Sequence, residues 1–250
     1  MDQRIAERRK EVERERRRRH GRLAVVGLIL VAVISGGALV ERSSLVALAE
    51  VQVRGTERLD ASDVRAAADL PLGTSTLRLR LGAARARVEA LPLVRAAQVE
   101  RVDPLTVRVT VRERVPELVV TTLSGAVLVD GAGLVIDRGV VEGLPQITTS
   151  VTELPRLGTP ITALPAAANA VAVHAALPGP LRAEVVRYEP RADDDVDLVL
   201  RNGLRVRFGR ADHVAEKART LGALLPGIEP TDVALIDVRA PSNPVVLPAA

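Results

Sequence analysis

Residues 91–116, LPLVRAAQVERVDPLTVRVTVRERVP, carry the pattern that decides the fold of the first part of the chain. Apolar and polar side chains alternate through the second half of this stretch, and the turn signal Asp103-Pro104 precedes it. The apolar set is Leu105, Val107, Val109 and Val111, and the polar set is Thr106, Arg108, Thr110 and Arg112. Period-two alternation is typical of a strand with one buried and one wet face. We therefore predict a strand here that is covered on one side only.

Short elements around this strand predict a compact α+β module. Residues 50–55 alternate, and Asp60 stands where the cap of a following helix belongs. A second helix is predicted over residues 81–91 and a second strand over residues 94–102. The order strand, helix, helix, strand, strand predicts a three-stranded sheet with two helices on one face.

The chain after Pro116 is predicted to consist mostly of strands. Turn dipeptides separate its alternating runs, and Asn202-Gly203 is the strongest hairpin signal among them. The strands expected late in this region cover 182–190, 195–201, 204–209 and 232–239. Its other expected elements are an irregular segment at 144–165, helices at 163–177 and 212–225, and a tail of low order at 240–250.

Positive charge is concentrated at the N-terminus. Residues 1–22 carry ten basic and five acidic side chains, and the rest of the chain has a net charge of −1. Aromatic residues make up only 1% of the chain. A nucleic-acid-binding domain is expected to spread basic side chains over a folded face, with rings for stacking. Nucleic acid is therefore not an expected partner.

An uncharged apolar run, residues 23–40, follows the basic tail. As a helix its 18 residues would span ~27 Å, which approaches the thickness of a bilayer core. The arginines before the run predict a cytoplasmic N-terminus and an extracytoplasmic remainder. Ala47-Leu48-Ala49 resembles a signal-peptidase site, so a cleaved signal is the alternative, but the length of the run favours an uncleaved anchor.

No chemical motif in the sequence predicts catalysis. The chain has no cysteine, which excludes disulfides, thiol catalysis and cysteine-ligated zinc. Gly131-Ala132-Gly133 is interpreted as a hairpin turn rather than a nucleotide loop, and Asp193-Asp194-Asp195 as a solvated turn. His20, His174 and His213 lack metal-ligand spacing. We expect no enzymatic activity, no cofactor, no metal and no small-molecule substrate.

An ordered series of residues gives the chain a resemblance to the bacterial cell-division family FtsQ/DivIB. The series comprises Val51-x-Val53-x-Gly55, Leu91-Pro92-x-Val94, Val99-x-Arg101-x-x-Pro104, Val111-Arg112-Glu113-Arg114-x-Pro116, Asp130-x-x-Gly133, Leu144-Pro145, Leu200-x-Asn202-Gly203, Gly209, Lys217 and Ile236-Asp237. No single motif is specific, but the series with one N-terminal anchor covers nearly the whole chain.

The resemblance implies a domain plan and a place in the cell. It implies a single-pass protein of the cell membrane at the division septum, with its bulk outside the cytoplasm. The expected segments are a cytoplasmic basic tail (1–22), a transmembrane helix (23–42), a POTRA domain (50–116), an FtsQ-type β domain (117–239) and a disordered tail (240–250).

The resemblance also implies a scaffold that binds the bitopic division proteins FtsB and FtsL outside the membrane. In relatives the contact uses the last strand of the β domain and the adjoining helix, and a strand at a sheet edge can accept another strand. Lys217 and Arg239 are expected to pair with acidic partner side chains. The expected contact residues are Lys217, Leu221, Leu224, Val233, Ala234, Leu235, Ile236, Asp237, Val238 and Arg239.

A secreted or membrane-anchored cell-wall enzyme is the alternative reading of the sequence. It would need a cluster of catalytic carboxylates or a serine nucleophile in the β domain, and the sequence offers no such constellation. The last strand and tail contain no aromatic residue, so the contact with a partner is expected to be aliphatic, through Leu235 or Val238.

Overall fold

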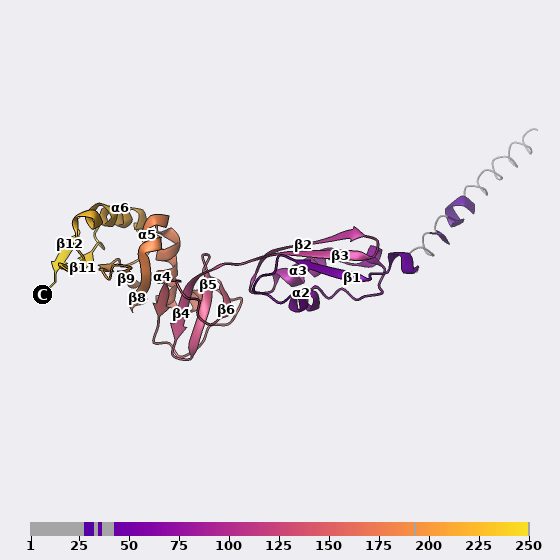
Figure 1. Cartoon of the computed structure of the whole chain (residues 1–250), viewed down its shortest axis with the longest axis horizontal. Coiled ribbons are helices and arrows are strands. Elements are labelled where there is room, and N and C mark those ends of the chain that lie inside the picture. The colour runs from indigo at the N-terminus through magenta and orange to yellow at the C-terminus, as the bar shows by residue number, and fades with distance from the viewer. Residues whose placement is uncertain (1–27, 33–34, 37–42, 193, 250) are drawn as a thin grey trace, which may run out of the picture. The chain divides into compact units, whose positions relative to one another are not determined.

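The computed structural model describes residues 28–32, 35–36, 43–192 and 194–249 (Figure 1). The basic tail predicted at 1–22 and most of the membrane helix predicted at 23–42 lie outside the described residues. Residues 28–32 are helical and exposed. Among the described residues, no helix combines the length and the apolar character that crossing a bilayer demands.

The described residues divide into two compact units, and each is considered by itself. Residues 43–54, 61–85 and 98–110 belong to the first unit, and residues 55–60, 86–97 and 111–249 to the second. Two sheets are present in the described part of the chain, one of three strands and one of nine. Strands with helices packed on them make the fold α+β, as predicted.

The three-stranded sheet contains β1 (Glu50–Arg54), β2 (Val94–Asp103) and β3 (Thr106–Glu113), in the order β1-β3-β2. β1 lies parallel to β3, with Val51 opposite Val107 and Val53 opposite Val109. Val107, Val109 and Val111 are buried, whereas Arg108 and Thr110 are half-buried. The predicted one-sided strand is therefore confirmed from Val107 onward. Its start is wrong, because Leu105 lies in the turn before β3 and is exposed, whereas Thr106 is buried.

Two helices accompany this sheet, as the sequence predicted: α2 (Ala61–Ala68) and α3 (Leu81–Glu89). Each helix buries two small apolar residues, which are Val64 and Ala68 on α2 and Ala84 and Val88 on α3. α2 packs on β1, and the buried residues of both helices are valine and alanine, so this core is built without rings. Single 3-10 turns lie at η1 (Ser44–Val46) and η2 (Thr76–Arg78).

The nine-stranded sheet runs in the order β12-β11-β10-β9-β8-β7-β4-β5-β6. The predicted hairpins β4–β5, β5–β6 and β9–β10 are antiparallel, and Asn202 closes the last of them by accepting a hydrogen bond from the Leu204 N–H at 3.1 Å. The strands are β4 (Pro116–Thr122), β5 (Gly125–Asp130), β6 (Val135–Arg138), β7 (Gln146–Thr148), β8 (Val185–Ala192), β9 (Asp195–Leu200), β10 (Arg205–Arg207), β11 (Val233–Asp237) and β12 (Val245–Pro248).

The segment predicted as irregular at 144–165 contains β7, which is an interior strand of this sheet. β7 lies parallel to β4 on one side and to β8 on the other. Its middle residue, Ile147, is fully buried. The prediction was wrong here because a three-residue strand is too short to show alternation, and its pairing comes from neighbours distant in sequence.

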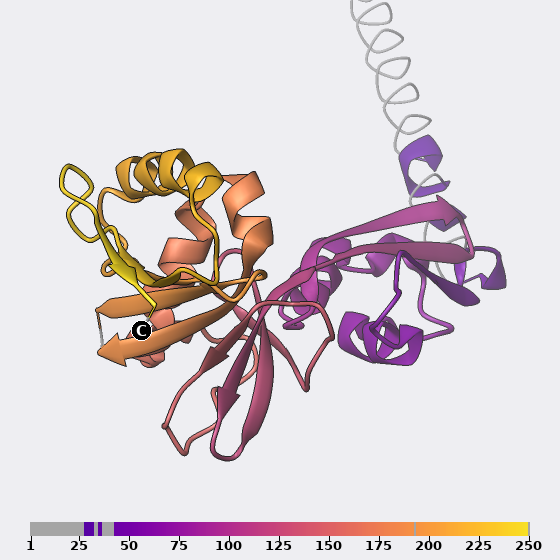
Figure 2. The ribbon, with the colours of Figure 1, turned by 60° about the vertical axis from the view of Figure 1, so that its left-hand side comes forward.

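Helices α4 (Pro165–Ala176), α5 (Gly179–Glu184) and α6 (Val214–Leu224) belong to the second unit, with 3-10 turns at η3 (Ile161–Ala163) and η4 (Leu225–Gly227). α4 packs on β8, β9 and α6, and Figure 2 shows the helices gathered on one side of the strands. The start of the strand predicted at 182–190 is wrong, because residues up to Glu184 form α5 and β8 begins at Val185.

The C-terminal segment also differs from its prediction. Instead of a tail of low order, residues 245–248 form β12, which pairs antiparallel with β11 through Leu235–Leu247 and Ile236–Val246. β11 pairs parallel with β10 on its other side. The expected edge strand β11 is therefore an interior strand, because the chain's own C-terminus completes its ladder.

Two glycines with the same backbone conformation allow a matched test of this architecture. Gly55 and Gly73 both have φ of +80°, which is strained for other residues. A Cβ at Gly55 would clash with the carbonyl oxygen of Val111, whereas nothing lies within 4 Å of a Cβ at Gly73.

We predict that Gly73→Ala lowers the free energy of unfolding by about 1–2 kcal/mol through its backbone conformation alone. Gly55→Ala should cost clearly more, roughly 3 kcal/mol or above, because the β3 backbone must also move. Chemical denaturation of the two variants beside the parent protein measures the difference. Equal losses of unfolding free energy in the two variants would show that the β3 backbone at Val111 moves aside at no cost.

Candidate partner-binding surface

The residues predicted to contact a partner come together at the β12 end of the nine-stranded sheet, on β11 and α6. Burial divides them into two groups. Lys217, Leu221, Ile236 and Val238 lie in the core, and their side chains do not reach the surface. Ala234 and Arg239 are exposed, and Leu224, Val233, Leu235 and Asp237 are half-buried.

Lys217 has its partners within the unit. Its ammonium donates to Asp212 Oδ1 at 2.6 Å and to the Arg210 carbonyl at 3.0 Å, and it lies 5.4 Å from the centre of the Phe208 ring. The hydrogen bond and charge of Lys217 hold the pKa of Asp212 below its ordinary value. The expected pairing of Lys217 with a partner's carboxylate does not fit this burial. Its role here is to fasten the loop before α6 to the helix.

Arg239 also pairs within the chain. Its guanidinium donates to both oxygens of Asp237, at 2.7 to 3.1 Å, and its backbone N–H donates to Asp237 Oδ1 at 3.0 Å. Burial works to raise the pKa of Asp237, but these hydrogen bonds outweigh it, and the pKa lies below the ordinary value. Arg239 is nevertheless exposed, so a partner's carboxylate could share its remaining N–H groups.

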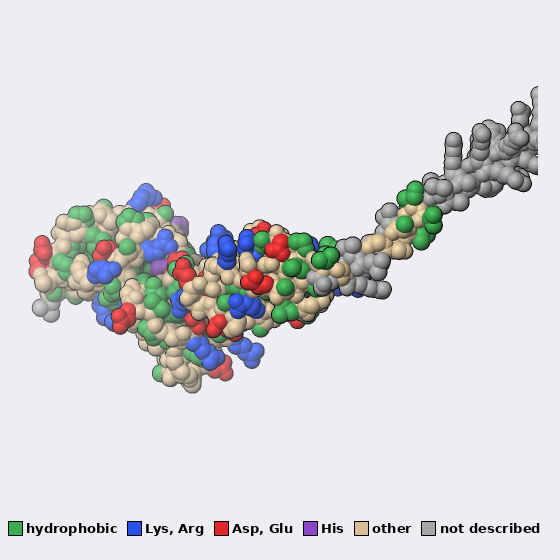
Figure 3. All heavy atoms as spheres, turned by 45° about the vertical axis from the view of Figure 1, so that its right-hand side comes forward, with side chains coloured by type: hydrophobic (Ala, Val, Ile, Leu, Met, Phe, Trp, Pro, Cys, Tyr) green, Lys and Arg blue, Asp and Glu red, His purple; other side chains and the backbone are tan. Residues whose placement is uncertain are grey.

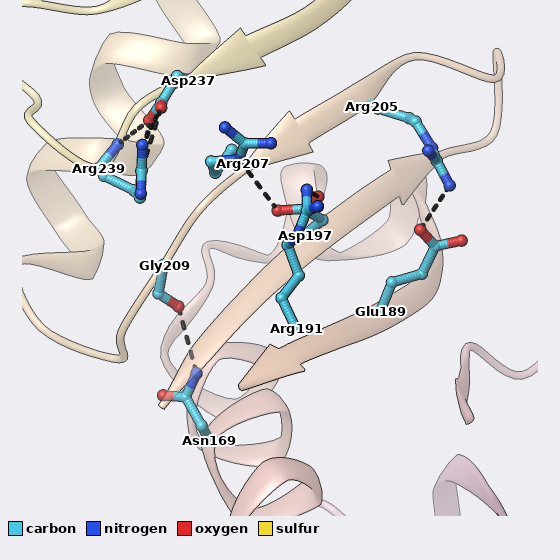
Figure 4. A network of polar contacts seen from close by, with 9 residues as sticks. All are labelled: Asn169, Glu189, Arg191, Asp197, Arg205, Arg207, Gly209, Asp237 and Arg239. Atoms are coloured by element: carbon cyan, nitrogen blue, oxygen red, sulfur yellow. Dashed lines mark hydrogen bonds and ion pairs between the residues drawn. The ribbon is translucent and has the colours of Figure 1, made fainter. Parts of the chain in front are cut away.

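Charged side chains line one face of β8, β9 and β10, as Figure 4 shows. Glu189 accepts from Arg205 at 2.6 Å, and Asp197 accepts from Arg191 at 2.9 Å. The opposite face of the same strands is apolar and belongs to the core, with Val196, Leu198 and Val206 fully buried. Successive side chains of these strands point to opposite faces, so one face belongs to the core and the other carries cross-strand ion pairs.

Asp197 is the most deeply buried carboxylate among these cross-strand ion pairs. Its side chain is only 4% exposed, and Arg207 Nε lies 3.8 Å from its Oδ1, too far for a hydrogen bond. Burial raises the pKa of Asp197 above its ordinary value, although Arg191 and Arg207 both oppose the rise. The carboxylate therefore sits in a site that solvates its charge incompletely.

A hollow of about 300 Å³ lies beside β11 and the start of α6. Both signs of charge line it, and Arg210 forms an ion pair with Asp194 at its rim. Its volume is at the lower end of the range of small-molecule sites, which is about 300–1,000 Å³. The lining residues are Asp194, Asp195, Gly209, Arg210, Asp212, Lys217 and Arg239.

β12 is the surface element that sequence reasoning missed. Val245, Val246 and Leu247 are 39–47% exposed, and β12 has a described strand on one side only. A β-branched run between two prolines, Pro244 and Pro248, was the available signal. The segment was nevertheless predicted to be a tail of low order, because it lies at the end of the chain.

The other candidate groups are structural. His174 Nδ1 lies 2.8 Å from the Tyr188 hydroxyl, and burial lowers the pKa of His174 and raises that of Tyr188. Asp130 accepts from the N–H groups of Ala132 and Leu134, so the Gly131-Ala132-Gly133 hairpin turn is confirmed. In the part of the chain that the structure describes, no three His, Asp or Glu residues gather as metal ligands would.

Asp197 and Asp237 should give opposite pH dependences when each is replaced by Asn. The folded pKa of Asp197 is raised above the unfolded value of about 3.9, so the parent protein loses stability as the pH rises through the folded pKa. The stability of Asp197→Asn relative to the parent should therefore increase as the pH rises above about 4.

For Asp237 the folded pKa is lowered, so its stabilising effect is present above the unfolded pKa and is lost as the pH falls. Asp237→Asn should therefore lose stability relative to the parent as the pH rises towards the unfolded pKa of about 3.9, which is a more acidic range than the one for Asp197. Urea unfolding at several pH values checks both slopes. Slopes of the same sign for the two variants would contradict this assignment of the charges.

Comparison with known proteins accounts for most of the chain. Residues 46–114 match the model of the POTRA domain, FtsQ-type, and residues 118–239 match that of the cell division protein FtsQ/DivIB, C-terminal. Cell division protein FtsQ of Streptomyces coelicolor is 30% identical, with 92% of each chain aligned. The corresponding protein of Streptomyces bingchenggensis is 31% identical over 90% of this chain and 85% of its own, and that of Mycobacteroides abscessus 30% over 90% and 68%. The chain therefore belongs to the FtsQ/DivIB family of bacterial cell-division proteins.

Proposed function

We propose that the chain is a non-enzymatic scaffold of the division machinery, anchored in the cell membrane at the septum with its N-terminus in the cytoplasm. Its partners in this proposal are bitopic division proteins of the FtsB and FtsL type. Membership of the FtsQ/DivIB family supports a role in the divisome and contact with other division proteins.

The partner's segment adds as a strand to the outer side of β12. The observation that carries this proposal is the unfinished end of the nine-stranded sheet: β12 is its terminal strand, and Val245, Val246 and Leu247 are exposed on it. A terminal strand offers unpaired backbone groups, and an incoming strand pairs with them. β11 does not offer such groups, because both its sides are paired.

Side chains near this edge would supply the specificity. Pro244 and Pro248 lack N–H groups, so the ladder available on β12 is short and gives limited affinity by itself. The mixed-charge hollow beside Arg210 and Arg239 adds a place for a charged partner side chain. Of the contact residues predicted from the sequence, three stay in the proposal: Ala234 and Arg239, which are exposed, and the half-buried Leu235, which lies opposite Leu247 on β12.

Leu247→Asp should reduce capture of an FtsB-type partner by roughly tenfold, since it places a charge in an apolar contact. Leu247 is exposed, so the variant should fold normally. Co-purification of the full-length chain with the partner from membranes measures the effect. The matched control is Leu123→Asp, at an exposed leucine of the β4–β5 turn, which should capture normally. Undiminished capture by a folded Leu247→Asp protein would overturn the proposal.

Removal of residues 244–250 separates addition to β12 from replacement of β12. If the partner pairs with β12, the shortened chain should lose capture, although β11 then becomes the edge. Retained or stronger capture would show that the partner takes the place of β12 on β11 instead. The experiment uses the same co-purification, with the circular dichroism spectrum of the shortened chain as the check on its fold.

A further inference from the structure

One end of the first unit carries an apolar patch with no cover among the described residues. It consists of Leu45, Leu72, Leu77, Val102 and Leu105, whose side chains are 38–70% exposed. Figure 3 shows hydrophobic side chains gathered over this part of the molecule. Single exposed apolar side chains are ordinary, but a group of five on one surface is typical of a contact site.

Backbone hydrogen bonds bring the three segments of the patch together. The Leu48 N–H donates to the Thr74 carbonyl at 2.9 Å, and the Gly73 N–H donates to the Leu48 carbonyl at 2.8 Å. The Ala49 N–H donates to the Leu105 carbonyl at 2.8 Å. The chain entering β1 is thus held between the loop before η2 and the β2–β3 turn.

Thr76 fixes the same arrangement from inside. Its buried hydroxyl lies 2.8 Å from the Pro104 carbonyl and 3.2 Å from the Val46 carbonyl. Arg101 donates from Nε to the Thr76 carbonyl at 2.6 Å and from Nη2 to the Leu79 carbonyl at 3.2 Å. The exposed leucines therefore stand on a fixed framework and not on a loop that could fold them inward.

In the sequence, the patch follows closely after the apolar run that is predicted to cross the membrane. The apolar run 23–40 ends five residues before Leu45, and five residues reach at most about 18 Å. Since hydrogen bonds tie residues 46–49 into the first unit, the patch cannot lie far from a bilayer in which that run is anchored.

The charged side chains around the patch are of the kind expected at the level of lipid headgroups. Arg78 and Arg80 are exposed directly after Leu77, and guanidinium groups bind lipid phosphates. Asp103, beside Val102, is exposed and accepts from the Leu105 N–H at 2.8 Å. A carboxylate at this position would keep the patch at the interface and out of the hydrocarbon core.

We propose that the patch of Leu45, Leu72, Leu77, Val102 and Leu105 rests on the extracytoplasmic surface of the membrane and is a second, peripheral contact between the chain and lipid. Shallow burial of leucines at the headgroup boundary is how interfacial segments bind membranes. This contact involves neither β12 nor a protein partner. It restricts the orientation of the first unit on the bilayer.

The absence of cysteine makes a direct test simple, because one introduced cysteine can carry a fluorophore sensitive to its surroundings. The full-length chain is placed as single copies in nanodiscs of phosphatidylcholine and phosphatidylglycerol, with or without lipids that bear a nitroxide on the acyl chain. The labelled positions are Leu72→Cys and Leu77→Cys. The control is Ser62→Cys, an exposed position in the first turn of α2, which follows the far end of β1.

Nitroxide lipids should quench the label at 72 and 77 several-fold more strongly than the label at 62. Adding Leu77→Glu to the Leu72→Cys chain should reduce that quenching, since a carboxylate opposes burial beside the acyl chains and is repelled by the anionic phosphatidylglycerol. Equal quenching at the three positions would overturn the proposal, as would quenching unchanged by Leu77→Glu. The quenching is also measured in discs that hold two copies. If the fluorescence of the label at 72 changes only in the two-copy discs, the patch is a self-association surface, and the proposal is overturned.

Discussion

The second unit depends on the parallel pairing of β7 with two neighbours. β4, β5 and β6 form one antiparallel group, and β8 to β12 form another group with β11 parallel to β10. Only β7 joins the groups, by parallel pairing on both sides. Parallel strands need long connections, and the chain supplies them in the segments before and after β7. With Ile147 buried at its centre, this three-residue strand turns two small sheets into one continuous sheet.

The two groups of strands differ in how their faces are used. In β4 the consecutive residues Leu118, Val119 and Val120 are all buried, with Val119 in a small cluster on the face opposite the main core. β9 instead alternates between core residues and the carboxylate of Asp197. The charged face of β8, β9 and β10 therefore lies towards the same end of the sheet as β12.

The sequence predicted those elements whose pattern is local. Alternation located β3, the Asn-Gly dipeptide located the β9–β10 hairpin, and helical spacing located α3. It could not predict β7 or β12, because both are short and gain their hydrogen bonds from distant partners. The same limit applies to the candidate site: Lys217 was recognised as part of the family pattern, but its burial against Phe208 depends on packing that spacing cannot reveal. The family membership predicted from the ordered series is confirmed.

The scarcity of rings has a practical consequence for following this molecule in solution. Tyr188 and Phe208 are the chain's two aromatic residues, and both are buried in the second unit. Every near-ultraviolet absorption or emission signal therefore originates in that unit. Unfolding of the first unit, whose buried apolar residues are all valine, leucine or alanine, would therefore not change the near-ultraviolet absorption or the fluorescence. The folding of the first unit can be followed through its peptide backbone, by far-ultraviolet circular dichroism or by amide hydrogen exchange.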